Sequence, residues 1–92
     1  MPRVARHLTI TGRVQGVWYR GWAVETATAL GLDGWVRNRR DGSVETVVAG
    51  KAAAVDDFIQ ACHHGPPSAR VDNVAVEDAE DLSERFHQRP TA

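Results

Sequence analysis

The sequence predicts an α+β domain with the element order β-α-β-β-α-β, which is the split βαβ or ferredoxin-like arrangement. Two periodicities predict it: apolar residues alternate at period two near the N-terminus, whereas two later segments repeat at the helical period. Glycine, proline and Asp-Gly sequences separate the segments. We expect an antiparallel sheet with two helices on one face. Residues 1–92 should form a single domain, because a chain this short has room for one core.

The first predicted strand lies within residues 4–14, where apolar and polar side chains alternate. A helix should follow from Gly21, since the next apolar residues recur at helical spacing. Its apolar face comprises Ala23, Val24, Ala27 and Leu30. Gly31 stands where a left-handed residue ends many helices, so we expect this helix to stop there.

Two more strands are predicted at residues 34–38 and 43–49. Asp41-Gly42 between them is a strong hairpin-turn signal, which makes this pair antiparallel. A second helix is predicted over residues 52–64, because its apolar residues form one stripe. The stripe comprises Val55, Phe58, Ile59 and Cys62. Gly65-Pro66-Pro67 should end this helix, since proline cannot continue the hydrogen-bond ladder.

The remaining chain predicts one clear strand and one short strand. Residues 71–76 have the pattern of a fourth strand, and residues 86–89 are expected to add a short fifth one. Between them, residues 77–81 are predicted to form an exposed acidic loop.

The composition, with 42% hydrophobic and 25% charged residues, is that of an ordinary globular protein. Net charge is −1, yet residues 1–46 contain seven arginines against four acids. This imbalance suits a small anionic ligand, whereas a nucleic-acid surface is usually more basic, so we expect no nucleic-acid partner. No apolar run is long enough to span a membrane. With Cys62 as its single cysteine, the chain is expected to be cytoplasmic. A monomer is expected because the sequence offers no strong extra apolar face.

The clearest functional signal is the segment from Gly12 to Arg20, in which a strand leads through a glycine-containing loop into a helix. Backbone N–H groups of such a loop can converge on one anion, and an arginine adds two parallel donors. The first helix carries the chain back along the sheet, so the strands at 4–14 and 34–38 should end at the same edge. We therefore expect Arg20 and Asn38 to face one ligand.

Two segments of the chain closely resemble the acylphosphatase family. They are Gly12-Arg-Val-Gln-Gly-Val-Trp-Tyr-Arg20, and Gly34-Trp-Val-Arg-Asn38 with the following Asp41-Gly-Ser-Val-Glu45. The likeness continues through Gly65-Pro66-Pro67 to Val74. It implies an enzyme that hydrolyses acyl phosphates to a carboxylate and inorganic phosphate, with no metal and no organic cofactor. A small acyl phosphate is the expected partner.

By this resemblance, Arg20 binds the phosphate and Asn38 orients the attacking water. The same resemblance assigns phosphate-binding backbone amides to Gln15, Gly16, Val17, Trp18 and Tyr19. The chemistry is consistent with these roles, because the leaving carboxylate has a low pKa and the enzyme mainly has to position and neutralise. An asparagine amide can accept a hydrogen bond from water without repelling the phosphate.

Simpler interpretations remain open for the same residues. Arg20 could be a surface cation paired with Glu25, and asparagine near a turn, as at Asn38, usually bonds local backbone. Gly12 and Gly16 also suit a bulge or a tight turn. Cys62 is expected to be a small core residue, and the three tryptophans to be packing or rim residues.

Two rival functions also remain. The first is a non-catalytic phosphate-binding or regulatory module, because this fold carries many unrelated functions. The second is the carbamoyl phosphate chemistry of acylphosphatase-like domains within larger maturation enzymes. A chain of 92 residues without a zinc motif argues against the second.

Overall fold

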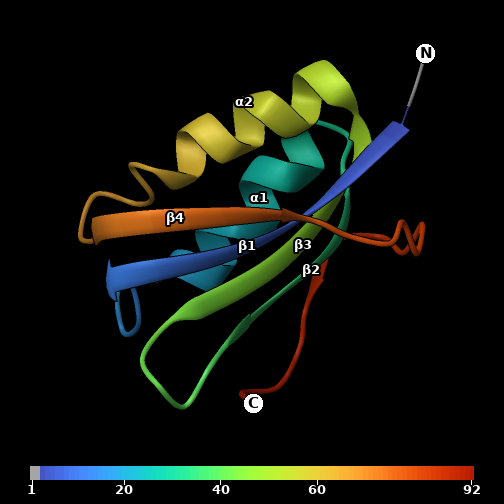
Figure 1. Cartoon of the computed structure of the whole chain (residues 1–92). Helices are drawn as coiled ribbons and strands as arrows, with labels where there is room; N and C mark the ends of the chain where they lie inside the picture. Colours follow the sequence, from blue (N-terminus) through green and yellow to red (C-terminus); the bar gives the residue numbers. More distant parts are fainter. Residues whose placement is uncertain (1–2) are drawn as a thin grey trace.

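A computed structural model describes residues 3–92. The chain order is β1 (Arg3–Arg13), α1 (Tyr19–Ala29), β2 (Asp33–Asn38), β3 (Val44–Lys51), α2 (Ala52–Cys62), β4 (Arg70–Asp78) and β5 (His87–Gln88). The strands form one sheet in the order β4-β1-β3-β2-β5, and both helices pack on the same face of it (Figure 1). The predicted α+β, ferredoxin-like order is confirmed, including a short fifth strand.

The sheet is mixed, however, and not antiparallel throughout as predicted. β5 pairs in parallel with β2, with Trp35 opposite His87 and Val36 opposite Gln88. The cause is the end of the sheet at which β5 begins. β4 ends beside the start of β1, and β2 starts at this same end of the sheet. A strand that follows β4 and lies beside β2 therefore starts at that end too and runs in the same direction as β2.

Two predicted boundaries are also corrected. The helix α1 begins at Tyr19, two residues before the predicted Gly21. Glu77 and Asp78 belong to β4 and not to an acidic loop, because they pair with His7 and Arg6 of β1. The alternation of apolar residues could not predict that the strand continues to Asp78, since β4 is an edge strand and exposes charged side chains to solvent.

The glycine at position 12 has a structural role. The register between β1 and β4 shifts at Thr11/Gly12, and Gly12 has φ 125. A Cβ atom there would overlap the carbonyl oxygen of Arg70. The bulge interpretation of Gly12 is therefore confirmed.

The core lies between the sheet and the two helices. α2 buries Val55, Phe58 and Cys62, as its stripe predicts, whereas α1 buries mainly Ala23 and Ala27 beside Tyr19. Core residues of the strands are Leu8, Ile10, Val36, Val44 and Val48. Small alanines let α1 lie close to the sheet, which brings its N-terminus next to the ends of β1 and β2.

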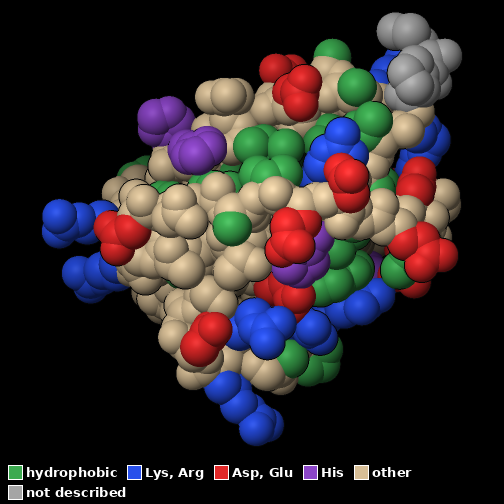
Figure 2. Space-filling model, viewed as in Figure 1, with side chains coloured by type: hydrophobic (Ala, Val, Ile, Leu, Met, Phe, Trp, Pro, Cys, Tyr) green, Lys and Arg blue, Asp and Glu red, His purple; other side chains and the backbone are tan. Residues whose placement is uncertain are grey.

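The face of the sheet away from the helices carries a charged cluster around Glu45. This carboxylate is 7% exposed, and it lies 2.7 Å from Nε of Arg37, 2.6 Å from Nε2 of His7 and 3.1 Å from Nη1 of Arg39. Basic, acidic and histidine side chains lie next to one another over the strands on this face (Figure 2). Through these three partners, Glu45 connects β3 to β1, to β2 and to the turn that follows β2.

We expect Glu45→Gln to remove an acid-sensitive part of the stability. Burial raises the pKa of Glu45, but hydrogen bonds from His7 and Arg37 and the charges of Arg37 and Arg39 bring this pKa below its ordinary 4.5. A lowered carboxyl pKa stabilises the fold above pH 4.5, and this contribution is lost as the pH falls through the folded pKa. Thermal melts from about pH 7 to about pH 3 should therefore show a shallower loss of Tm in Glu45→Gln than in wild type. The exposed Glu80→Gln is the control; equal pH slopes in wild type and Glu45→Gln would contradict the prediction.

Candidate active site

The loop between β1 and α1 is held by buried side chains on either side of an exposed glycine. Val14 and Val17 are buried in the core, whereas Gly16 is exposed and has φ 72. Glycine adopts this left-handed backbone without strain, and a Cβ at this position would meet no atom within 4 Å. The space beside Gly16 is therefore open to a ligand.

The start of α1 has no side-chain cap. Trp18 is the N-cap residue and makes no capping hydrogen bond, and the first helical bond runs from Trp22 N–H to the Trp18 carbonyl at 3.0 Å. The preceding N–H groups of the first turn consequently have no carbonyl partner within the helix. Such N–H groups, together with the helix dipole, favour an anion.

Tyr19 fixes this helix end to the second helix. Its hydroxyl donates to the Cys62 carbonyl at 2.7 Å, and its ring is buried. Burial raises the pKa of Tyr19 far above its ordinary value, so the phenol keeps its proton. Burial also raises the pKa of the Cys62 thiol to about 12, which agrees with the predicted core role of this cysteine.

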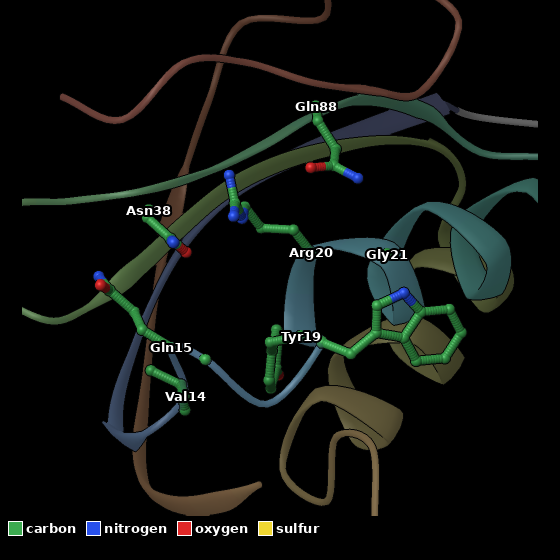
Figure 3. A pocket seen from close by; sticks show the side chains of 9 residues that line it. Val14, Gln15, Tyr19, Arg20, Gly21, Asn38 and Gln88 are labelled. Atoms are coloured by element: carbon green, nitrogen blue, oxygen red, sulfur yellow. The ribbon is translucent and has the colours of Figure 1, made fainter. Parts of the chain in front are cut away.

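A cavity of about 140 Å³ opens at this helix start. Its lining comes from three separate parts of the chain: the loop and first turn of α1, the end of β2, and β5. The side chains that carry polar groups at its lining are those of Gln15, Arg20, Asn38 and Gln88. The rest of the wall comes from the loop and the first turn of α1 and comprises Val14, Gly16, Trp18, Tyr19 and Gly21. In Figure 3 the side chain of Arg20 extends from the helix start toward Asn38, with Gln15 and Gln88 on either side.

The structure thus brings Arg20 and Asn38 to one cavity, as the topology predicts. Val36 and Asn38 are two residues apart in β2, so both side chains point to the helix face of the sheet. Within residues 3–92, neither the Arg20 guanidinium nor the Asn38 amide has a hydrogen bond or ion pair to another side chain or to backbone. The surface pair with Glu25 and the local bond of Asn38 are both missing from this part of the chain.

Two polar residues of the cavity have roles that the sequence did not reveal. Gln15 Nε2 donates to the carbonyls of Arg39 and Ser43 at 2.7 and 2.8 Å, which ties the loop to the β2–β3 hairpin. Gln88 enters from β5. The predicted fifth strand included Gln88, but nothing in the sequence places that strand beside β2.

Val17 is the one predicted ligand-binding residue that does not line the cavity. Its side chain is buried in the core, so a backbone amide is the only group that it could offer. Trp18, in contrast, is 61% exposed and has φ 68, an uncommon conformation for a large aromatic residue. No local pattern in the sequence indicates this backbone conformation.

The other two tryptophans pack as predicted. Trp35 is buried, and the guanidinium groups of Arg37 and Arg89 lie 4.9 and 4.5 Å from its ring centroid. Trp22 makes an edge contact with Tyr19 at 5.1 Å between centroids. In the described part of the chain, no three His, Cys, Asp or Glu side chains form a group that could hold a metal ion. Nor is any helix of residues 3–92 long and apolar enough to cross a membrane.

Fold and cavity together define a small α+β domain in which an arginine and an uncapped helix start line one cavity. Comparison with known proteins identifies the family within this class. The family model described as acylphosphatase matches residues 6–88. An acylphosphatase of Rhizorhabdus wittichii is 53% identical over 90 residues, covering 97% of this chain and 91% of the relative. An acylphosphatase of Bradyrhizobium diazoefficiens is 57% identical, covering 86% and 80%. The chain belongs to the acylphosphatase family.

Solved structures agree with this assignment. An acylphosphatase from Coxiella burnetii superposes with a TM-score of 0.88 at 37% identity, covering 95% of this chain and 93% of that one. A full-length HypF in a phosphate- and nucleotide-bound form matches with a TM-score of 0.89 at 28% identity, but this match covers 98% of the present chain and 12% of HypF. The resemblance and fold predicted from the sequence are confirmed.

Proposed function

We propose that the cavity at the start of α1 is the active site of an acyl phosphate hydrolase, with Arg20 and Asn38 as its catalytic residues. As a member of the acylphosphatase family, the chain is an enzyme that hydrolyses acyl phosphates. One observation carries the assignment of the site: the side chains of Arg20 and Asn38, which have no partner within residues 3–92, line one cavity at an uncapped helix start.

The phosphate would be held by the Arg20 guanidinium and by backbone N–H groups of residues 15–20. A guanidinium fork matches two phosphate oxygens, and N–H groups fixed by the fold need no reorganisation as charge develops. The cavity of about 140 Å³ admits a group of this size, and in this proposal a larger acyl part extends outside it.

Asn38 would accept a hydrogen bond from the attacking water and set its line of approach. The water oxygen forms a bond to phosphorus while the bond from phosphorus to the acyl oxygen breaks. The carboxylate leaves with that electron pair, and the two protons of the water remain on the phosphate product as dihydrogen phosphate. No strong general acid is required, because a carboxylate is a good leaving group.

We also propose that the protein acts as a cytoplasmic monomer. The buried thiol of Cys62 agrees with a reducing compartment. The exposed edge of β4 carries charged residues, which disfavours pairing with the edge of a second copy. Light scattering on the purified protein tests the monomer directly.

The decisive experiment is hydrolysis of benzoyl phosphate in excess EDTA, measured by the release of benzoate. We expect the wild type to turn over the substrate in EDTA and to be inhibited by inorganic phosphate. Adding metal back should not increase the rate. Phosphate binding without turnover would instead favour the non-catalytic binding module. Carbamoyl phosphate should be assayed in parallel, since efficient cleavage of it alone would favour the second rival function.

Gln15→Ala is expected to weaken both the fold and the site. The change removes two hydrogen bonds to the hairpin, although the Arg39 and Ser43 carbonyls each keep a backbone partner. The free energy of unfolding should fall by about 1 kcal/mol. Because Asn38 directly precedes this hairpin, kcat/KM for benzoyl phosphate should fall roughly tenfold. Urea unfolding and steady-state kinetics measure both effects, with the exposed Gln60→Ala as control. A destabilised Gln15→Ala with unchanged kcat/KM would contradict the positioning role.

A further inference from the structure

We propose that the open groove between α1 and α2 is the acyl-binding subsite, and that it selects uncharged aromatic acyl groups over acyl groups that carry a carboxylate. This inference rests on the proposed function, because it places the part of the substrate that the phosphate cavity leaves outside.

The groove has a volume of about 680 Å³ and shares the lining residue Trp18 with the phosphate cavity. Trp18 lines both spaces, so its indole is the surface that a substrate crosses between them. Apolar lining then continues through Trp22, Ala29 and Leu30 of α1 to Ala61 of α2. An acyl group attached to a phosphate held by Arg20 would therefore leave the small cavity over an aromatic ring.

Trp18 is built into this position at a structural cost. It is 61% exposed, so burial does not account for it, and its left-handed backbone (φ 68, ψ 25) is unfavourable for a bulky residue. Its indole rests directly on Gly21, where a Cβ atom would overlap Nε1 of the ring. A strained, exposed aromatic residue that needs a glycine beneath it fits a ligand platform better than a packing residue.

The groove also has a charge preference. Glu25 and Asp57 are its charged lining residues, one from each helix. Two carboxylates beside an apolar surface repel an acyl group that carries its own negative charge. Trp22, held by its edge contact with Tyr19, offers a second ring to an aromatic acyl group. The combination favours benzoyl-like groups and disfavours acyl groups that carry a carboxylate of their own.

The first test compares benzoyl phosphate with acetyl phosphate in wild type, Trp18→Ala and Gly21→Ala. The readout is the ratio of the two kcat/KM values, so a general loss of activity cancels. Loss of the ring contact should lower this ratio roughly tenfold in Trp18→Ala and by a smaller factor in Gly21→Ala, which displaces the indole. The exposed Leu82→Ala, which lies outside the groove lining, is the matched control and should keep the wild-type ratio.

The second test uses 4-carboxybenzoyl phosphate, which has the same ring and one added charge. Asp57→Asn, alone and with Glu25→Gln, should raise its kcat/KM by roughly threefold to tenfold at low salt while benzoyl phosphate changes little. Asp56→Asn is the matched control, because Asp56 is an exposed neighbour that does not line the groove.

The outcomes separate the two proposals. Absence of hydrolysis of every acyl phosphate by the wild type would overturn the proposed function. Hydrolysis with an unchanged benzoyl to acetyl ratio in Trp18→Ala would overturn the acyl subsite alone. The subsite would also be overturned if the protein is a dimer that Trp18→Ala dissociates without changing the ratio, since the groove then holds a second copy.

Discussion

Arg20→Ala should lose turnover of benzoyl phosphate by about 1,000-fold or more, and inhibition by inorganic phosphate should disappear with it. The guanidinium is the charged donor of the cavity, and no carboxylate within residues 3–92 competes for it. Its removal leaves backbone N–H groups alone to neutralise the phosphate, both in the ground state and in the transition state. Initial rates and a phosphate inhibition series measure the two losses, with circular dichroism to verify folding.

Two further variants sharpen this test. Arg20→Lys keeps the charge but not the planar fork, so it should recover only part of the lost rate. Arg40→Ala removes an exposed arginine that does not line the cavity and should behave as wild type. Undiminished phosphate inhibition in folded Arg20→Ala would contradict the assigned role.

Asn38→Ala should lower kcat by roughly 100-fold to 1,000-fold while phosphate inhibition stays close to that of the wild type. In the proposed mechanism Asn38 acts on the water and not on the phosphate, so the loss should appear in the transition state alone. Steady-state kinetics with benzoyl phosphate separate kcat from KM, and the inhibition constant of phosphate reports the anchor.

The design of this experiment includes one informative substitution and one control. Asn38→Asp retains an oxygen that can accept from water but adds a charge that repels the phosphate, so it should lose phosphate affinity as well. Asn73→Ala lies on the exposed edge strand β4 and should leave both constants unchanged. A large loss of phosphate inhibition in Asn38→Ala would make Asn38 a residue that holds the ligand.

Much of the fold could be predicted because local pattern and topology agree. The stripe of α2 is buried as its spacing requires, and Gly31 has the left-handed φ of 71 expected at the end of α1. The shared direction of β1 and β2 follows from the helix between them, and it was sufficient to bring Arg20 and Asn38 to one place.

The rest depends on contacts that no local pattern encodes. Gln88 reaches the cavity only because β5 crosses to the far edge of the sheet and pairs with β2. Gln15 bonds to carbonyls more than twenty residues away, and glutamine has no spacing rule that would reveal them. The left-handed backbone of Trp18 contradicts the preference of its own side chain, so only the surrounding structure could show it.

The place of β1 between β4 and β3 in the sheet has a consequence for how the chain folds as it is synthesised. Leu8 pairs with Thr46 of β3 on one side and with Val76 of β4 on the other. A nascent chain that has exposed only β1 and α1 therefore has neither neighbour for this strand, and the loop that precedes α1 has no hairpin to hold it. Because both partners of β1 follow α1 in the chain, we expect β1 to complete its pairing only after β4 has left the ribosome.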